Sequence, residues 1–401
     1  MPALGTAPST RLRRARLAVG ACFFVNAVLY ANLIPRLPEV KTDLGLSNSS
    51  LGAALAALPL GALLAGMSSA VLIRRFGSAR VASAGLFLLA AAVWGASAAP
   101  NWPLLAGALL LAGALDAIVD VAQNAHGLRV QRAYGRSILN AFHGIWSIGA
   151  VAGGLLGSAA AGLGIPLPLH LGVVGLLFGV PALFGSRAML PGHDDTERAA
   201  DDRPAPSAAT TRALRRAAQP AMAALGVLAA CGAFVEDAGA SWSALYLRDE
   251  LAVGAAVAGL GFVALSVAMT VGRLTGDRVV DRFGQRRVVR AGGALTAAGM
   301  GLALAVPSIP TTLLGFALAG LGVATLVPAV YHAADELPGL PRGLGLAIVN
   351  WLLRIGFLLS PPLIGVVADA TSLRVALVTV VLAGIGALTF GRVLPRTVAG
   401  G

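Results

Sequence analysis

The sequence predicts an all-α membrane protein with twelve transmembrane helices in two pseudo-symmetric six-helix bundles. Composition is the first observation behind this prediction. Of the 401 residues, 57% are hydrophobic and only 12% are charged, and the mean hydropathy is +0.80. Soluble domains carry about 25% charged residues. The chain therefore has too few charges to cover a water-facing surface.

The second observation is a series of long apolar stretches. A transmembrane helix needs about 20 mostly apolar residues to cross about 30 Å of hydrocarbon. Twelve stretches meet this requirement, approximately at residues 17–35, 51–73, 81–99, 103–127, 138–164, 167–187, 219–245, 254–276, 289–307, 311–334, 344–367 and 372–393. The first stretch follows several arginines, as a signal peptide would, but it is too long for one and is predicted to be a retained helix.

Basic residues concentrate at the termini and in every second loop, which is typical of the cytoplasmic side. Four of them fall in the opposite loops, namely Arg36, Lys41, Arg248 and Arg374. Both termini are therefore expected in the cytoplasm, with the chain crossing the cytoplasmic (inner) membrane many times. The net charge of +12 is attributed to these loops at an anionic membrane surface and not to nucleic-acid binding.

The third observation is an internal repeat. Residues 75–77 (Arg-Phe-Gly) recur as residues 282–284, and Leu51-Gly52 is matched by Ala258-Gly259 at the same offset of 207 residues. A polar, proline-containing stretch at 189–218 separates the two halves and is predicted to be a cytoplasmic linker. The expected division is a bundle over 1–188 and a second bundle over 219–401.

The sequence contains no recognisable motif for several classes of chemistry. Cys22 and Cys231 lie in separate apolar runs, which argues against a disulfide framework. Lys41 is the only lysine and lacks the glycines of a phosphate-binding loop. Zinc-protease and nucleophile-elbow motifs are also missing. The chain is predicted not to be an enzyme and to need no cofactor.

Several motifs resemble known transporters. Residues 281–287 (DRFGQRR) resemble the cytoplasmic signature of the major facilitator superfamily, of which the first-half copy, with Arg74 in the acidic position, is degenerate. More specifically, the segments at 36–41, 120–126, 142–147, 242–247 and 361–365 are similar to the YbjJ-like branch, which is related to fucose permeases. Gln123 and Ser241 depart from that pattern. The resemblance implies the major facilitator fold and a proton-linked carrier that works by alternating access.

Ionisable residues inside predicted membrane helices are the candidates for proton coupling, because a charge at the bilayer centre costs about 2.5–3.5 kcal/mol. Asp116, Asp120 and Asn124 are spaced i, i+4, i+8 and share one helix face. Glu236 is preferred over the adjacent Asp237 because the resemblance places an acid there. The proton-coupling candidates are thus Asp116, Asp120 and Glu236, with helix packing or ion pairing as the alternative role.

Polar and aromatic residues on the predicted cavity helices are the candidates for solute binding. Arg354 lies deep in its helix and is either an anchor for an anionic group or the partner of Asp120 or Glu236. His143 can bond solute, shuttle a proton or simply bridge helices. The complete set of solute-binding candidates is Asn26, Tyr30, Asn124, His143, Trp146, Trp242, Tyr331 and Arg354.

The repeated loops are the candidates for gating. Arg273, Asp277 and Asp281 are spaced so that opposite charges can pair along one helix, although a solvated topogenic loop is the alternative. The gating candidates are Arg75, Gly77, Arg273, Asp277, Asp281, Arg282 and Gly284.

The leading functional hypothesis is a proton-coupled secondary transporter of a small polar solute, sugar-like or organic. The alternatives are a proton-driven exporter of drugs or secondary metabolites and, from another class, a non-transporting receptor or scaffold. The expected partners are a small-molecule solute, protons and the lipid bilayer, with the protein acting as a monomer.

Overall fold

The computed structural model describes residues 9–66, 68–135, 138–192, 220–337 and 344–395, which form helices and no strands. Within these residues, twelve helical segments are long and apolar enough to cross a membrane, as the sequence predicted. They are Thr10–Asp43, Asn48–Ala65, Ser78–Ser97, Trp102–Tyr134, Leu139–Gly162, Leu167–Ala188, Pro220–Asp249, Ala255–Phe283, Gln285–Ala305, Ile309–Asp335, Leu344–Ala370 and Leu373–Val393. Most of the expected linker, residues 193–218, lies outside the described residues.

Several helices extend beyond the apolar stretches that predicted them. Helix α1 (Thr10–Ala31) begins seven residues before the predicted start, because Ser9 caps it by accepting a hydrogen bond from the N–H of Leu12 at 3.3 Å. Helix α6 (Trp102–Tyr134) continues to the left-handed Gly135, past the predicted end at residue 127. Hydropathy marks only the part of a helix that crosses lipid, whereas backbone hydrogen bonding continues into the polar turns.

Contacts divide the chain into two compact units that do not follow the two halves of the sequence at every point. Unit 1 comprises residues 1–33, 57–156 and 165–202, and unit 2 comprises residues 34–56, 157–164 and 203–401. Two short segments of the first half, 34–56 and 157–164, therefore belong to unit 2 by their contacts. A division of the bundles at the 189–218 linker remains a prediction.

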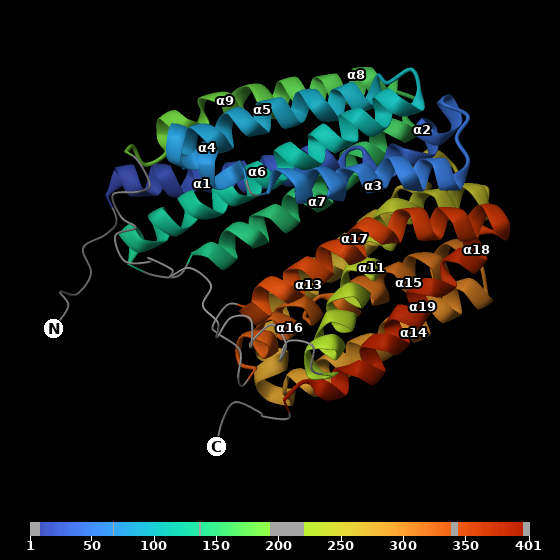
Figure 1. Cartoon of the computed structure of the whole chain (residues 1–401). Coiled ribbons are helices and arrows are strands. Elements are labelled where there is room, and N and C mark those ends of the chain that lie inside the picture. The colour runs from blue at the N-terminus through green and yellow to red at the C-terminus, as the bar shows by residue number, and fades with distance from the viewer. Residues whose placement is uncertain (1–8, 67, 136–137, 193–219, 338–343, 396–401) are drawn as a thin grey trace. The chain divides into compact units, whose positions relative to one another are not determined.

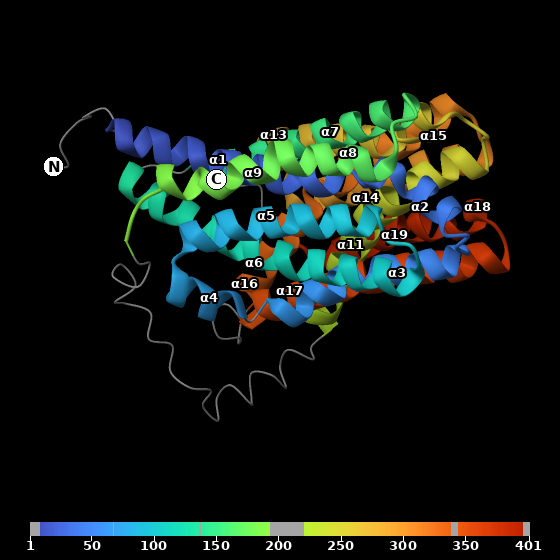
Figure 2. The same cartoon turned by 90° about the horizontal axis from the view of Figure 1, so that it is seen from above.

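Unit 1 is built on α1, α5 (Ser78–Ser97) and α6, which lie alongside one another in both views (Figures 1 and 2). It also contains α4 (Ser68–Phe76), most of α7 (Leu139–Gly162), and the succession of α8 (Leu167–Val174), the π-helical turn η2 (Gly175–Gly179), α9 (Val180–Gly185) and η3 (Ser186–Ala188). The rings of Phe23 and Phe142 stack at 5.5 Å in its core and fix α1 against α7.

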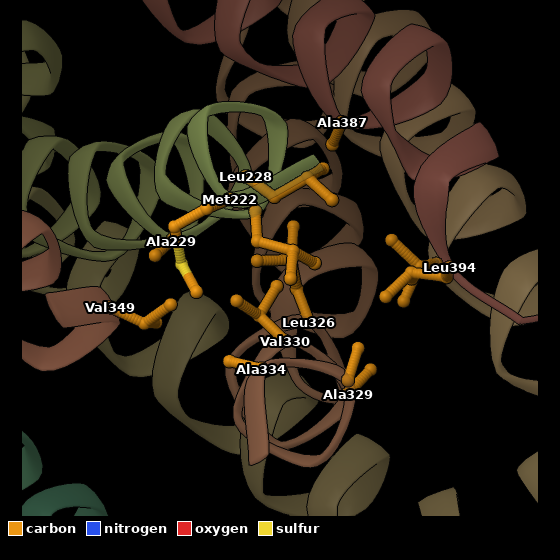
Figure 3. Close-up of a cluster of buried hydrophobic side chains, with 13 residues drawn as sticks. Met222, Leu228, Ala229, Leu326, Ala329, Val330, Ala334, Val349, Ala387 and Leu394 are labelled. Atoms are coloured by element: carbon orange, nitrogen blue, oxygen red, sulfur yellow. The ribbon is translucent and has the colours of Figure 1, made fainter. Parts of the chain in front are cut away.

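Unit 2 contains the long helices α11 (Pro220–Asp249), α13 (Leu260–Phe283), α14 (Gln285–Ala305), α15 (Ile309–Val323) and α17 (Leu344–Ala370). The shorter elements are η1 (Ile34–Arg36), α2 (Leu37–Asp43), α12 (Ala255–Ala258), α16 (Leu326–Asp335), α18 (Leu373–Ala376), α19 (Val378–Phe390) and η5 (Gly391–Val393). Helix α3 (Asn48–Ala65) begins in unit 2 and ends in unit 1. Figure 3 shows a cluster of buried side chains that includes Met222, Leu326, Val349 and Leu394 and joins α11, α16 and α17.

The internal repeat is visible in the local backbone. Gly77, between α4 and α5, has φ +82° and ψ 146°, and Gly284, between α13 and α14, has φ +80° and ψ 147°. In each copy the preceding arginine lies over the ring of its neighbouring phenylalanine, at 5.3 Å for Arg75 and 5.5 Å for Arg282. Two sequence segments 207 residues apart therefore make the same turn.

Candidate transport site

A chain of hydrogen bonds joins three helices of unit 1. The indole Nε1 of Trp146 on α7 donates to the Oδ1 of Asn26 on α1 at 2.8 Å. The Nδ2 of Asn26 in turn donates to the Oδ1 of Asp116 on α6 at 2.7 Å. Asn26 is buried, and the other two are partly buried. Three residues proposed separately from the sequence thus form one polar network inside apolar helices.

The next turn of α6 carries a second polar group. Asn124 donates through its Nδ2 to the Oδ1 of Asp120 at 2.9 Å, as the shared face predicted. Gln123, the residue that departs from the family pattern, donates to the same carboxylate at 3.5 Å. Asp120 is exposed on unit 1, so it is more accessible to water or solute than Asp116.

His143 and Tyr30 complete the predicted residues of unit 1. The imidazole of His143 is exposed and meets the ring of Phe23 edge-on at 5.2 Å. Tyr30 lies one helical turn after Asn26 on α1 and is partly buried. Both side chains lie on the two helices that the Trp146–Asn26 bond connects.

In unit 2, Glu236 and Arg273 form an ion pair between α11 and α13. The guanidinium Nη2 lies 3.3 Å from one carboxylate oxygen and 3.4 Å from the other. The expected pairing of Arg273 with Asp277 along α13 does not occur, because Arg273 reaches across to the neighbouring helix. Asp277 and Asp281 are exposed and form no ion pair within the described part of the chain. Helical spacing showed which charges can meet on one helix but could not show a competing partner on another.

Arg354 is the second cation of interest in unit 2. Its side chain is partly buried, and none of the described carboxylates forms an ion pair with it. Glu236, one of its two predicted partners, is instead bound to Arg273. One turn before Arg354 on α17, Asn350 accepts a hydrogen bond from the Tyr331 hydroxyl on α16 at 3.0 Å. The structure thus joins Tyr331 to Asn350 one turn from a guanidinium that has no ion-pair partner among the described residues.

Trp242 is in a different environment from the one expected of a solute platform. Its side chain is 0% exposed, and its Nε1 has no hydrogen-bond partner among the described residues. Tyr246, one turn later, is equally buried. In this conformation Trp242 packs inside unit 2 and is not available to a solute.

Sequence reasoning passed over two groups of polar residues. Asp237 is one, because Glu236 was preferred; it accepts a hydrogen bond from Ser241 Oγ at 3.3 Å.

The second group is a set of charges around α2 and the start of α3, all in unit 2. Here Arg36 binds Glu39 through two hydrogen bonds, Lys41 pairs with Asp249 at 2.7 Å, and Asp369 accepts from the N–H groups of Asn48 and Ser49 at 2.9 and 2.8 Å. Arg36, Glu39 and Lys41 belong to a motif that carried the family resemblance, which was the available signal.

Comparisons with known proteins agree with this architecture. The family model for the Major Facilitator Superfamily matches residues 19–242 and 223–400. An uncharacterized MFS-type transporter of Yersinia pestis is 30% identical over 385 residues, covering 94% of this chain and 92% of that protein. Membrane protein MosC of Rhizobium meliloti is 31% identical over 368 residues, covering 92% and 87% respectively.

Two solved structures show a similar fold. The nucleoside transporter NupG has a TM-score of 0.75 at 15% identity, covering 94% of this chain and 98% of that one. A variant of the E. coli fucose:proton symporter FucP has a TM-score of 0.63 at 18% identity, covering 95% and 98%. At these identities the likeness concerns the fold alone. The family model, which matches both halves, and the relatives that are 30% and 31% identical establish that the chain belongs to the Major Facilitator Superfamily, whose members are multi-pass membrane transporters and not enzymes.

Proposed function

We propose that this protein is a proton-coupled secondary transporter that moves a small polar solute across the cytoplasmic membrane by alternating access. The observation that carries the proposal is the network of Trp146, Asn26 and Asp116, which joins three spanning helices through polar side chains. Polar groups are expensive inside a membrane and typically mark a substrate or ion pathway. Indole, amide and carboxyl groups together provide the donors and acceptors that a hydroxyl-rich solute requires.

The role proposed for each residue follows from its environment. Asp116 and Asp120 are proposed to couple protons in unit 1. Glu236 is proposed to respond to protons indirectly, because neutralising it would release Arg273. Solute contacts are assigned to the remaining predicted residues on the cavity helices, which are Asn26, Tyr30, Asn124, His143, Trp146, Tyr331 and Arg354, with Trp242 taking part only after a rearrangement.

The solute class is supported by the names of structurally similar proteins. They include a nucleoside transporter, a fucose:proton symporter and a D-xylose-proton symporter. All three names describe hydroxyl-rich cargo, and two describe a proton symporter. The motif at residues 36–41, which the structure folds as η1 and α2, supports membership of the YbjJ-like branch related to fucose permeases.

The gating and topology proposals rest on the repeated loops. Equal turns at Gly77 and Gly284 suit two equivalent hinges, one in each half of a transporter. Arg75, Asp277, Asp281 and Arg282 are proposed to gate beside them. The basic residues near both turns favour a cytoplasmic location for these loops and for both termini. The protein is proposed to act as a monomer.

Transport by the purified full-length chain in lipid vesicles tests the proposal. Labelled fucose, xylose and uridine would be offered to vesicles with an imposed inward proton gradient, and collapse of the gradient by a protonophore is the control. We expect gradient-dependent accumulation of at least one solute and its loss in Asp116→Asn. Accumulation in inverted vesicles alone would indicate export. If a wide solute panel shows no movement in either orientation, the receptor or scaffold alternative would be favoured.

A further inference from the structure

Asp237 on α11 is a half-buried acid, with one carboxyl oxygen inaccessible to solvent, to which the mechanism above gives no role. We infer that Asp237, and not its neighbour Glu236, is the carboxyl group of α11 that holds a proton in the described conformation. The use of that proton in transport rests on the proposed function, whereas its presence does not.

The Asp237 carboxyl group receives few hydrogen bonds from its neighbours. Its Oδ2 is inaccessible to solvent and has no hydrogen-bond partner among the described residues. Its Oδ1 receives one long bond, 3.3 Å, from the hydroxyl of Ser241. Ser360 of α17 adjoins the same carboxyl group, and its fully buried Oγ also lacks a partner within the described part of the chain. Two polar atoms that need a partner thus lie near one another.

Within the described part of the chain, no cation forms an ion pair with Asp237. The residue before it, Glu236, is also acidic. Arg273 on α13, the helix that packs against α11, is bound to Glu236. Arg354 lies on α17 but nearly two turns before Ser360.

The other elements packed against α11 supply no further cation to this site. Helices α12, α15 and α19 contain no charged residue. On η1, α2 and α16 the ion pairs are Arg36–Glu39, Lys41–Asp249 and His332–Glu336, Asp335 makes a further contact, and Asp43 is exposed and acidic. Arg278 and Arg282 lie farther along α13 and are exposed. Arg392 of η5 precedes Val393 and Leu394, which pack with Met222 and Leu225 more than three turns before Asp237 on α11. A negative charge on Asp237 would therefore lie partly out of solvent, next to a second acid and without a counter-ion among the described residues. Burial of this kind favours the neutral form of a carboxyl group.

The surroundings also offer an acceptor for the O–H of a neutral carboxyl group. A proton on Asp237 can be donated to the oxygen of the neighbouring Ser360 hydroxyl, whereas a carboxylate would accept the proton of that hydroxyl. Ser360 therefore suits either state, and the lack of a counter-ion decides between them.

The two adjacent acids then have distinct tasks. Glu236 pairs with Arg273, while Asp237 is neutral and stores a proton at a site where one of its oxygens is closed to solvent. In a conformation that admits water beside Ser360, the carboxyl O–H bond breaks and the proton passes to water, which leaves a solvated carboxylate. Only the proton moves, and no oxidant or further reactant is needed.

Infrared difference spectroscopy on the full-length protein in lipid vesicles tests this inference without any solute. The probe is the pH itself, varied from mildly acidic to mildly alkaline, and the readout is the C=O stretching band of protonated carboxyl groups. At neutral pH we expect one such band in the wild type, shifted in deuterium oxide, that is lost in Asp237→Asn. Asp237→Glu should move the band without removing it, which guards against a misfolded amide variant.

Glu236→Gln is the matched control, because it removes the neighbouring carboxyl group on the same helix. The band should persist in this variant. The inference is overturned if the band is unchanged in Asp237→Asn and Asp237→Glu, or if Glu236→Gln removes it. These spectra remain decisive even if the transport assay finds no solute, so failure of this inference and failure of the proposed function can be told apart.

Discussion

Gly77 and Gly284 adopt the same backbone conformation, with φ angles of +82° and +80° and ψ angles of 146° and 147°. Each glycine ends one helix of a repeat and begins the next. Residues with a side chain almost never adopt this combination of angles. The two turns therefore require glycine for a reason that is independent of packing, since a Cβ on Gly77 would meet no atom within 4 Å.

Replacing either glycine by alanine should destabilise the protein. We expect Gly77→Ala and Gly284→Ala each to lower the free energy of unfolding by about 1–3 kcal/mol, the usual cost of a strained backbone position. Thermal unfolding of the purified variants measures this effect. Gly95→Ala is the matched control, because Gly95 lies in the helix that follows Gly77, has no positive φ and also has open space around its Cβ position. Equal losses at Gly77 and Gly95 would contradict the backbone argument.

The Trp146–Asn26 bond should matter for transport as well as for stability. Trp146→Phe removes the indole donor and leaves the buried Oδ1 of Asn26 without it, which costs about 1–3 kcal/mol. We expect reduced solute uptake, because the freed amide no longer holds Asp116 in place. Trp94→Phe also removes an indole hydrogen bond, to the Pro168 carbonyl at 3.1 Å, but on an exposed surface. Similar transport losses in both variants would argue against a specific role for the network.

A double-mutant cycle can measure the Glu236–Arg273 ion pair. Because 26% of the glutamate and 37% of the arginine side chain are exposed, solvent screens the pair and a coupling energy of about 1 kcal/mol or less is expected. Thermal unfolding of Glu236→Gln, Arg273→Gln and the double variant provides the cycle. The charge-reversed double variant, Glu236→Arg with Arg273→Glu, should recover stability that each single reversal loses. Additive effects throughout would show that the pair contributes nothing.

Arg354 should act through the geometry of its guanidinium and not only through its charge. Lysine keeps the charge but loses the planar fork that binds a carboxylate or a set of acceptors in two places. If Arg354 anchors the solute, Arg354→Lys and Arg354→Gln should both reduce the rise in melting temperature that a transported solute produces. Tyr331→Phe should cause a smaller reduction, because it removes one hydroxyl bonded to Asn350. Unchanged solute stabilisation in Arg354→Gln would exclude the anchor role.

The fold could be predicted because membrane helices are long, apolar and numerous, and each leaves its own signal in the sequence. Pair contacts could not be predicted in the same way. The spacing of Arg273 and Asp277 allows an ion pair along α13, yet Arg273 pairs with Glu236 on the neighbouring helix α11. Trp242 was predicted to contact solute, whereas tertiary packing buries it completely. Glu236 was preferred to Asp237 because of the family resemblance, and only tertiary packing shows that one oxygen of Asp237 is closed to solvent.

Asp369 provides a last test, at a helix start that no pattern in the sequence indicated. Its carboxylate accepts the N–H groups of Asn48 and Ser49, the first two residues of α3, from a position near the end of α17. Asp369→Asn keeps one acceptor oxygen but loses the charge that favours a helix N-terminus, so a loss of about 0.3–1 kcal/mol in the free energy of unfolding is expected. The carboxylate is exposed, and the loss should therefore shrink as salt is added. Glu336→Gln, which removes an exposed acid that pairs with His332, is the control and should change stability less. A loss at Asp369 that is insensitive to salt would show that geometry, and not charge, fastens α3 to α17.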